Sequence, residues 1–186
     1  MTTETTARAK ANQSNPVEAQ YKLDATINGA NGGLYLAFRL TVDVYAIDIL
    51  RIREIVEFTK PTSVPLMPPS LRGVINLRGA VVPVIDLAVR FGREATGVGK
   101  RTCIVIVEVE HAGASRVLGL MVDGVNAVME ISPNNIEPSP DFGTRVDSDF
   151  IAGMARIDGH LFIILDIARV LSIQEMAAIK TVGADD

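Results

Sequence analysis

The sequence GVINLRGAVVPVIDL, from Gly73 to Leu87, combines the most strand-like residues of the chain with its most informative turn. It predicts a β-hairpin in which residues 71–75 lead in, residues 76–79 turn, and the valine-rich residues 80–85 lead out. Asn favours the first position of a type I turn, and Gly favours the fourth, where φ is often positive. We therefore expect Asn76 and Gly79 to bracket a type I turn.

The same pattern returns as GMARIDGHLFIILDI, from Gly153 to Ile167. Three residues keep their place in both copies, and they form the pairs Gly73 and Gly153, Gly79 and Gly159, and Asp86 and Asp166. Arg78, in contrast, corresponds to Asp158. Shared residues are expected to serve the fold, whereas the fold alone does not require the arginine.

The segments before the two hairpins are also related. LYLAFRL from Leu34 predicts a strand, a turn is expected at residues 41–43, and the alternation from Ile47 to Val56 predicts one further half-buried strand. The run from Arg116 to Ile131 repeats this pattern after a strand that begins near Thr102. Two copies of a five-strand unit predict an all-β fold of two small antiparallel barrels. Parallel pairing is not expected, because no helix of crossover length separates the strands.

These patterns divide the chain into a flexible tail and one domain. Residues 1–30 have no hydrophobic period and are expected to form the tail, and residues 31–186 form the domain. Within it we expect a first lobe at about 34–92, a second lobe at about 101–170, and a C-terminal helix at about 172–181. The lobe boundaries are approximate, because the chain can cross between the barrels.

Composition excludes several classes of function. With 186 residues, of which 48% are hydrophobic, the chain can bury a real core. Its 18 basic and 22 acidic residues are interspersed and give a net charge of −4, which disfavours nucleic-acid binding. A single cysteine, Cys103, fits a reducing compartment, and no apolar run reaches the ~18 residues of a membrane span. We therefore expect a cytoplasmic protein without direct membrane insertion.

The residue pattern does not predict a catalytic centre. The two histidines, His111 and His160, fall in predicted turns, and neither lies at ligand spacing from Cys103 or from an acidic pair. Asp86 and Asp166 are better explained as helix N-caps, worth ~1 kcal/mol each, than as a catalytic pair. We expect no enzyme activity, no cofactor and no metal site.

The charges of the first copy differ from those of the second. Arg51, Arg53, Glu54 and Arg78 align with Gly124, Asn126, Ala127 and Asp158. These charges could be ordinary solvated side chains, each contributing within about 0.5 kcal/mol to stability. They could equally form a recognition surface, because arginine beside exposed Val and Ile is typical of protein interfaces. Periodicity alone does not separate the two interpretations.

Five segments in order closely resemble the CheW family of bacterial chemotaxis coupling proteins. They are YAIDILRIREI (45–55), GVINLRGAVVPVIDL, LGLMVDGVNAVMEI (118–131), IEPSPDF (136–142) and the C-terminal EMA (175–177). The likeness runs from about Leu34 to Lys180. It implies two five-stranded SH3-like barrels that are packed together and enclose an additional apolar core, with short helical turns and a C-terminal helix.

The resemblance also implies partners. It predicts a non-enzymatic adaptor that couples the cytoplasmic tips of methyl-accepting chemoreceptors to the regulatory domain of the histidine kinase CheA in membrane-associated arrays. Further CheW copies, arranged in rings, are additional candidate partners. The implied receptor-binding residues are Ile49, Ile52, Glu54, Asn76, Arg78, Gly79, Val81 and Cys103, and the implied kinase-binding residues are Ile136, Glu137 and Phe142.

The implied receptor site includes Glu54 and Arg78, two of the charges that the second copy lacks. The resemblance therefore favours the recognition surface over ordinary solvation. Glu137 occupies a place that can be basic in relatives, which puts the charge of the kinase contact in question. The alternative function is a small-ligand sensor that uses the space between the barrels as its pocket.

Overall fold

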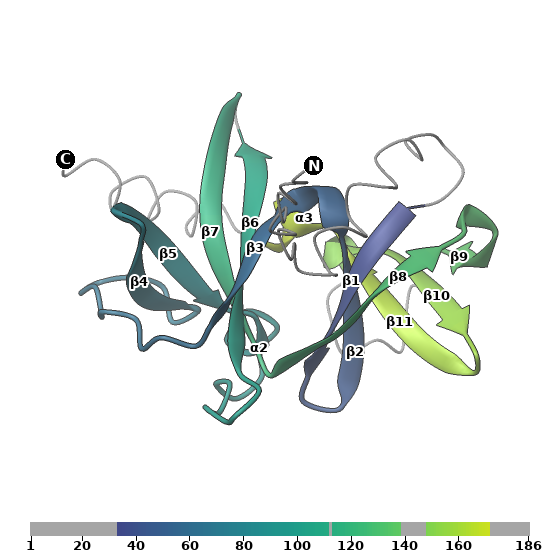
Figure 1. Ribbon diagram of the computed structural model, residues 1–186, viewed down its shortest axis with the longest axis horizontal. Coiled ribbons are helices and arrows are strands. Elements are labelled where there is room, and N and C mark those ends of the chain that lie inside the picture. Colours follow the sequence, from purple (N-terminus) through teal and green to yellow (C-terminus); the bar gives the residue numbers. More distant parts are fainter. Residues whose placement is uncertain (1–32, 112, 139–147, 172–186) are drawn as a thin grey trace, which may run out of the picture.

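Two β-sheets lie side by side in the computed structural model, which describes residues 33–111, 113–138 and 148–171 (Figure 1). The five-strand barrel has the strand order β3-β6-β7-β5-β4. Its strands are β3 (Ile52–Glu57), β4 (Leu71–Leu77), β5 (Ala80–Asp86), β6 (Cys103–His111) and β7 (Ala114–Val122). The predicted tail and C-terminal helix lie outside the described residues.

The six-strand barrel has the order β8-β1-β2-β11-β10-β9. Its strands are β1 (Gly33–Leu40), β2 (Asp43–Asp48), β8 (Gly124–Ile131), β9 (Ile136–Glu137), β10 (Ile151–Ile157) and β11 (His160–Leu165). Short helical turns connect the strands, namely η1 (Ile49–Arg51), α2 (Leu87–Arg90), η2 (Pro133–Asn135), η3 (Ser148–Phe150) and α3 (Ile167–Val170). The all-β prediction is confirmed, with the two-residue β9 as an additional strand of the six-strand barrel.

The two sequence copies exchange strands. The first copy contributes β1 and β2 to the six-strand barrel and β3, β4 and β5 to the five-strand barrel, whereas the second copy sends β6 and β7 to the five-strand barrel. The expected lobe boundaries at residues 92 and 101 are therefore wrong, because each lobe takes two strands from the other copy. The chain crosses between the barrels at η1 and again between β7 and β8.

This exchange produces one parallel strand pair in each barrel. β5 pairs in parallel with β7, and β11 pairs in parallel with β2, while the other pairs described are antiparallel. The expectation of purely antiparallel barrels is wrong. In each barrel the parallel neighbour is a strand from the other copy, so no crossover helix is needed to bring it into place.

The register confirms the alignment of the two copies. In β3 the ladder with β6 shifts between Ile52 and Glu54, so that Arg53 is the bulged residue. In β8 the ladder with β1 skips Asn126, which aligns with Arg53. The hairpins match as well. The ladder skips Arg72 in β4 and Ala152 in β10, each directly before one of the equivalent glycines Gly73 and Gly153.

Gly73 is required where the five-strand barrel closes. Thr62, five residues beyond the end of β3, pairs with Val74 through two hydrogen bonds of 2.8 and 2.9 Å, which join the segment after one edge strand to β4, the other edge strand. A Cβ on Gly73 would lie 2.1 Å from the carbonyl oxygen of Thr62, and the φ of Gly73 is +140°. Both facts favour glycine.

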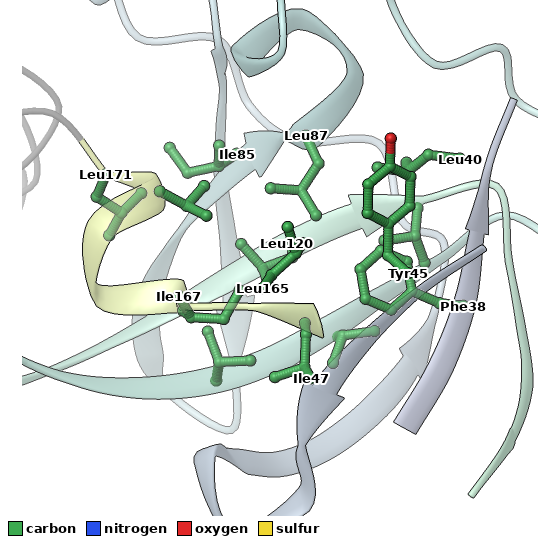
Figure 2. Close-up of a cluster of buried hydrophobic side chains, with 14 of the residues drawn as sticks. Phe38, Leu40, Tyr45, Ile47, Ile85, Leu87, Leu120, Leu165, Ile167 and Leu171 are labelled. Carbon is green, nitrogen blue, oxygen red and sulfur yellow. The ribbon is translucent and has the colours of Figure 1, made fainter. Parts of the chain in front are cut away.

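Apolar side chains fill three regions. Alternation along β6 sends Ile104 and Ile106 into the five-strand barrel, and it sends Val105 and Val107 into the space between the barrels. A separate cluster that includes Phe162 fills the six-strand barrel. The region between the barrels, drawn in Figure 2, is the largest, and it confirms the implied additional core. Each fully buried Leu or Ile there stabilises the fold by about 1.5–3 kcal/mol.

The chain between Ile47 and Val56 is not one strand as predicted. Asp48 ends β2 and its side chain accepts a hydrogen bond from Leu50 N at 2.9 Å, which caps the 3-10 turn η1 before β3 begins. Local alternation was ambiguous here because a side-chain cap competes with strand pairing. The two α-helical turns, α2 and α3, follow Asp86 and Asp166, which confirms both carboxylates as N-caps.

Candidate functional site

The tip of the β4–β5 hairpin is a two-residue turn made by Arg78 and Gly79. Their φ angles are +52° and +87°, and Leu77 pairs with Ala80 across the turn. Two-residue turns with positive φ at both positions match the twist of a hairpin. The expected type I turn is therefore wrong, although Asn76 still holds the turn, because its Oδ1 accepts a hydrogen bond from Gly79 N at 2.9 Å.

Arginine is an unusual residue for this backbone. A residue other than glycine with positive φ is uncommon, and Asn and Asp are several-fold enriched among those observed. The equivalent turn of the β10–β11 hairpin has the same geometry, with φ of +51° at Asp158 and +78° at Gly159, and it uses the favoured type of residue. Turn geometry therefore does not account for Arg78.

Arg78 forms an exposed ion pair with Glu54. Its two terminal nitrogens donate to the two carboxylate oxygens of Glu54, each at 2.8 Å. The Arg78 side chain is 77% exposed and that of Glu54 is 26% exposed. This bidentate pair joins the hairpin tip to β3, the opposite edge strand. In the six-strand barrel, Ala127 occupies the position equivalent to Glu54, so among the described residues an equivalent ion pair is found only in the five-strand barrel.

The predicted receptor-binding residues other than the Glu54–Arg78 pair fall into two groups. Asn76, Gly79 and Val81 surround Arg78 at the hairpin tip, where Val81 is 51% exposed. The second group is half-buried against the core between the barrels, and it consists of Ile49, Ile52 and Cys103. Burial raises the pKa of the Cys103 thiol, opposed by a hydrogen bond from the backbone of Val125. The structure thus pairs Glu54 with Arg78 directly, whereas these three residues pack against the core between the barrels.

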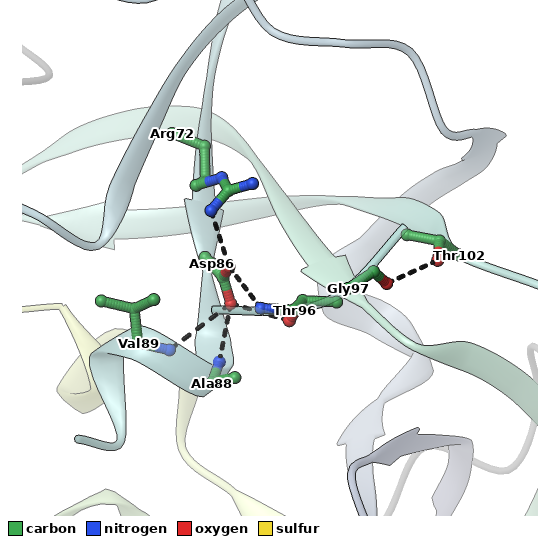
Figure 3. Close-up of polar contacts among 7 residues, drawn as sticks. All are labelled: Arg72, Asp86, Ala88, Val89, Thr96, Gly97 and Thr102. Atoms are coloured by element: carbon green, nitrogen blue, oxygen red, sulfur yellow. Dashed lines mark hydrogen bonds and ion pairs between the residues drawn. The ribbon is translucent and has the colours of Figure 1, made fainter. Parts of the chain in front are cut away.

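A buried carboxylate anchors the base of the same hairpin (Figure 3). Asp86 is fully buried, and it accepts hydrogen bonds from the backbone nitrogens of Ala88 and Val89 at 3.0 and 3.4 Å. It also accepts from Thr96 N at 2.9 Å and from Thr96 Oγ1 at 2.8 Å. Arg72 on β4 lies 3.7 Å away. Because a buried charge needs several partners, this network fixes α2 and the following loop to the hairpin.

The predicted kinase-binding residues lie at the edge of the other barrel. Ile136 and Glu137 form β9 and pair with Ala155 and Met154 of β10. Ile136 packs against the six-strand core, and Glu137 is exposed. Phe142, the third predicted residue, lies outside the described residues.

Comparison with known proteins identifies the family. A family model described as a CheW-like domain matches residues 34–175. The chain belongs to the CheW-like family. Chemotaxis protein CheW of Klebsiella aerogenes is 32% identical over 82% of this chain and 89% of its own length. Chemotaxis protein CheW of Rhizobium meliloti is 35% identical over 80% of this chain and 94% of its own length.

A solved structure agrees with this assignment. The crystal structure of scaffolding protein TtCheW from Thermoanaerobacter tengcongensis superposes with a TM-score of 0.70 at 34% identity, and it covers 80% of this chain and 94% of that one. The CheW-like fold and the resemblance found in the sequence are therefore both confirmed.

The CheW-like chain shows no assembled metal site within its described ranges, where no three His, Cys, Asp or Glu residues come together. Among the helices of the same ranges, none combines the length and hydrophobicity needed to cross a bilayer.

Side chains occupy the space in which the alternative function would place a ligand. Tyr45, Ile47, Leu120 and Ile85 are fully buried there and come from both barrels (Figure 2). A hollow of about 200 Å³ lies where the two barrels meet. It is lined by Tyr35, Ile47, Asp48, Arg51, Val109, Ala152, Ile164, Leu165, Asp166, Ile167 and Ala168. That volume is below the 300–1,000 Å³ typical of ligand pockets. The geometry does not favour a sensor.

Sequence reasoning missed part of the site. It identified Asp86 as a cap but not as the centre of a network, since Thr96 lies ten residues away in a loop without regular pattern. The sequence shows the same Asp in both copies and so gave no signal of the difference: Asp166, the equivalent carboxylate, is only half-buried and caps one nitrogen, that of Ala168.

Proposed function

We propose that this CheW-like chain is a non-enzymatic adaptor that couples chemoreceptor cytoplasmic tips to the histidine kinase CheA. The observation that carries the proposal is the exposed Arg78 at a turn whose geometry favours Asn or Asp. A residue that is unfavourable for its backbone and largely solvated serves something other than folding. Membership of a family whose relatives are named chemotaxis proteins supports the same conclusion.

The receptor is the proposed partner of the hairpin tip. Arg78 and Glu54 present both signs of charge, and the exposed Val81 beside them offers apolar area. An arginine held in a fixed geometry is a typical interface anchor, because it binds carboxylates in a bidentate manner. A receptor carboxylate would compete with Glu54 for Arg78, so the partner surface should carry an acidic group next to an apolar one.

The kinase is the proposed partner of the second surface. Ile136 and Glu137 sit on the edge of the six-strand barrel, whereas the hairpin tip belongs to the five-strand barrel. Separate patches allow both partners to be bound at once, and each weak contact gains from the effective concentration within an array. We place the protein in the cytoplasm, at membrane-bound receptor arrays, where further CheW copies would be neighbours.

Signalling through such an adaptor depends on differential affinity. A scaffold that binds two states of a kinase equally shifts neither state. The adaptor must therefore hold the receptor or the kinase more strongly in one signalling state.

The test is to mix the chain with a receptor cytoplasmic fragment and CheA, and to measure ternary complex formation and kinase activity. We expect a ternary complex whose kinase activity differs from that of CheA alone. Phe142→Ala should weaken kinase association while leaving receptor binding intact. Absence of a ternary complex, or equal loss of both contacts, would contradict two separate surfaces.

A further inference from the structure

The end of α2 points the chain from the five-strand barrel toward the six-strand barrel. Gly92 N donates to Val89 O and Arg93 N donates to Ala88 O, each at 2.9 Å, and the φ of Gly92 is +74°. This is the Schellman pattern, in which a left-handed glycine reverses the chain after the last helical turn. Arg93 therefore leaves α2 in a defined direction.

Arg93 forms hydrogen bonds to the β1–β2 hairpin of the six-strand barrel. Its Nη1 donates to Thr41 Oγ1 at 2.8 Å, and its Nη2 donates to Asp43 Oδ2 and to Tyr45 OH, both at 2.9 Å. The Arg93 side chain is only 15% exposed, and that of Asp43 is 29% exposed. These are charge-assisted contacts largely shielded from water, unlike the Arg78 pair.

Two preceding residues make further contacts with the six-strand barrel. Phe91 inserts between Tyr45 and Phe150, with ring centroids 5.6 and 6.0 Å away. Arg90 donates from Nε to Val170 O at 2.6 Å, and its guanidinium lies 4.6 Å from the centre of the Phe150 ring. We call Arg90, Phe91 and Arg93 the α2 clamp.

The second copy cannot form the same clamp. Its aligned residues are Val170, Leu171 and Ile173, which have neither a guanidinium nor an aromatic ring. Arg90 and Val170 are equivalent residues, yet they bond to each other, so this contact lies where the two copies meet. Charges present in one copy alone therefore also serve a contact inside the molecule.

We propose that the α2 clamp is an orientation lock that fixes the angle between the two barrels. The apolar core between them holds the barrels together, but hydrophobic attraction is non-directional and scales with buried area. Several relative orientations could bury similar areas of Leu, Ile and Val. The planar guanidinium of Arg93 meets three oxygens of the β1–β2 hairpin, one from the turn and two from β2, and this geometry is satisfied at one orientation only. Arg93 is thus a positioning residue.

The proposal concerns the isolated chain, and it holds or fails whether or not the adaptor function is correct. The experiment measures the distance between one spin label on each barrel in the full chain, with Glu57→Cys on β3 and Glu130→Cys on β8 in a Cys103→Ala background. Both labelled positions are exposed and lie outside the clamp. With the α2 clamp intact, the doubly labelled protein should give one narrow distribution of the distance between the two labels.

Arg93→Met keeps the apolar stem but removes the guanidinium, and it should broaden or shift the distribution. Asp43→Ala removes a partner from the other barrel and should do the same, which provides a second variant if the first does not fold. Arg53→Met is the matched control, because Arg53 pairs with Glu108 at 2.7 Å within the five-strand barrel. The control should keep the narrow distribution. An unchanged distribution in both clamp variants, or equal broadening in the control, would overturn the proposal.

Discussion

Replacing Arg78 by Asn separates binding from folding, because the two effects should be very different in size. The exposed pair with Glu54 contributes about 0.2–1 kcal/mol, and the 77% exposure of Arg78 places it near the lower end. Asn is better suited than Arg to the φ of +52°, and Asn-Gly is the favoured sequence for a two-residue hairpin turn. The two changes oppose each other and should leave the free energy of unfolding within about 0.5 kcal/mol of wild type.

Binding should respond much more strongly. If Arg78 is an interface anchor, its loss should cost about 2 kcal/mol or more, which corresponds to a roughly 30-fold weaker complex with a receptor cytoplasmic fragment. Calorimetric titration measures the affinity, and thermal unfolding measures stability. The melting temperature should move by about 2 °C or less, since 1 kcal/mol shifts it by about 2–4 °C at this size.

The second hairpin supplies the control for this experiment. Asp158→Asn changes the equivalent turn residue, whose φ is +51°, and should alter neither affinity nor stability appreciably. Wild-type affinity of Arg78→Asn would remove Arg78 from the receptor surface. An equal loss of affinity in Asp158→Asn would show that hairpin tips in general, and not this arginine, determine binding.

Three further predictions concern stability and reactivity. Gly73→Ala should destabilise the fold by about 2–4 kcal/mol in urea unfolding, because its Cβ would lie 2.1 Å from a carbonyl oxygen. A Cβ at Gly79 meets no atom within 4 Å, so Gly79→Val should cost only the strain of positive φ, about 1–2 kcal/mol. A larger loss for Gly79→Val than for Gly73→Ala would disprove the account of barrel closure. Asp86→Ala should lower the free energy of unfolding by about 3 kcal/mol and Asp166→Ala by about 1 kcal/mol, since only the first leaves buried donors unpaired. Similar losses in the two variants would show that the network around Asp86 stabilises the fold no more than a helix cap does. Because burial raises the pKa of Cys103, its alkylation at neutral pH should be slower than that of a free thiol and should accelerate as pH rises, while rapid labelling at neutral pH would contradict the half-buried position.

The sequence predicted the repeated elements well, because their determinants are local. Glycines at the hairpin tips, carboxylate caps and valine-rich strands carry their own turn and strand chemistry, so Gly79, Asp86 and the β5 strand could be located from the residues around them. The alignment of Arg53 with Asn126 was also recoverable, and matching bulges confirm it.

The strand exchange could not be predicted in the same way. Whether β6 pairs with β1 or with β3 depends on which long-range closure buries more apolar surface, and the residues within each strand do not decide it. Arg93 was missed for a related reason: its partners Asp43 and Tyr45 are close only after the barrels have assembled. The pair between Glu54 and Arg78 was predicted as a set of unshared charges, but its direct contact needed the closed barrel.

Reciprocal strand exchange also affects how this chain can be made. When synthesis has reached the loop after α2, the three strands β3, β4 and β5 are complete, but β6 and β7, which complete their barrel, have not yet been translated. The barrel of β1 and β2 likewise remains incomplete until β8, β10 and β11 have been translated. Neither half of the gene therefore encodes an independent folding unit. The nascent N-terminal half can form the β1–β2 and β4–β5 hairpins, but β3 stays without its strand partner until β6 has been translated.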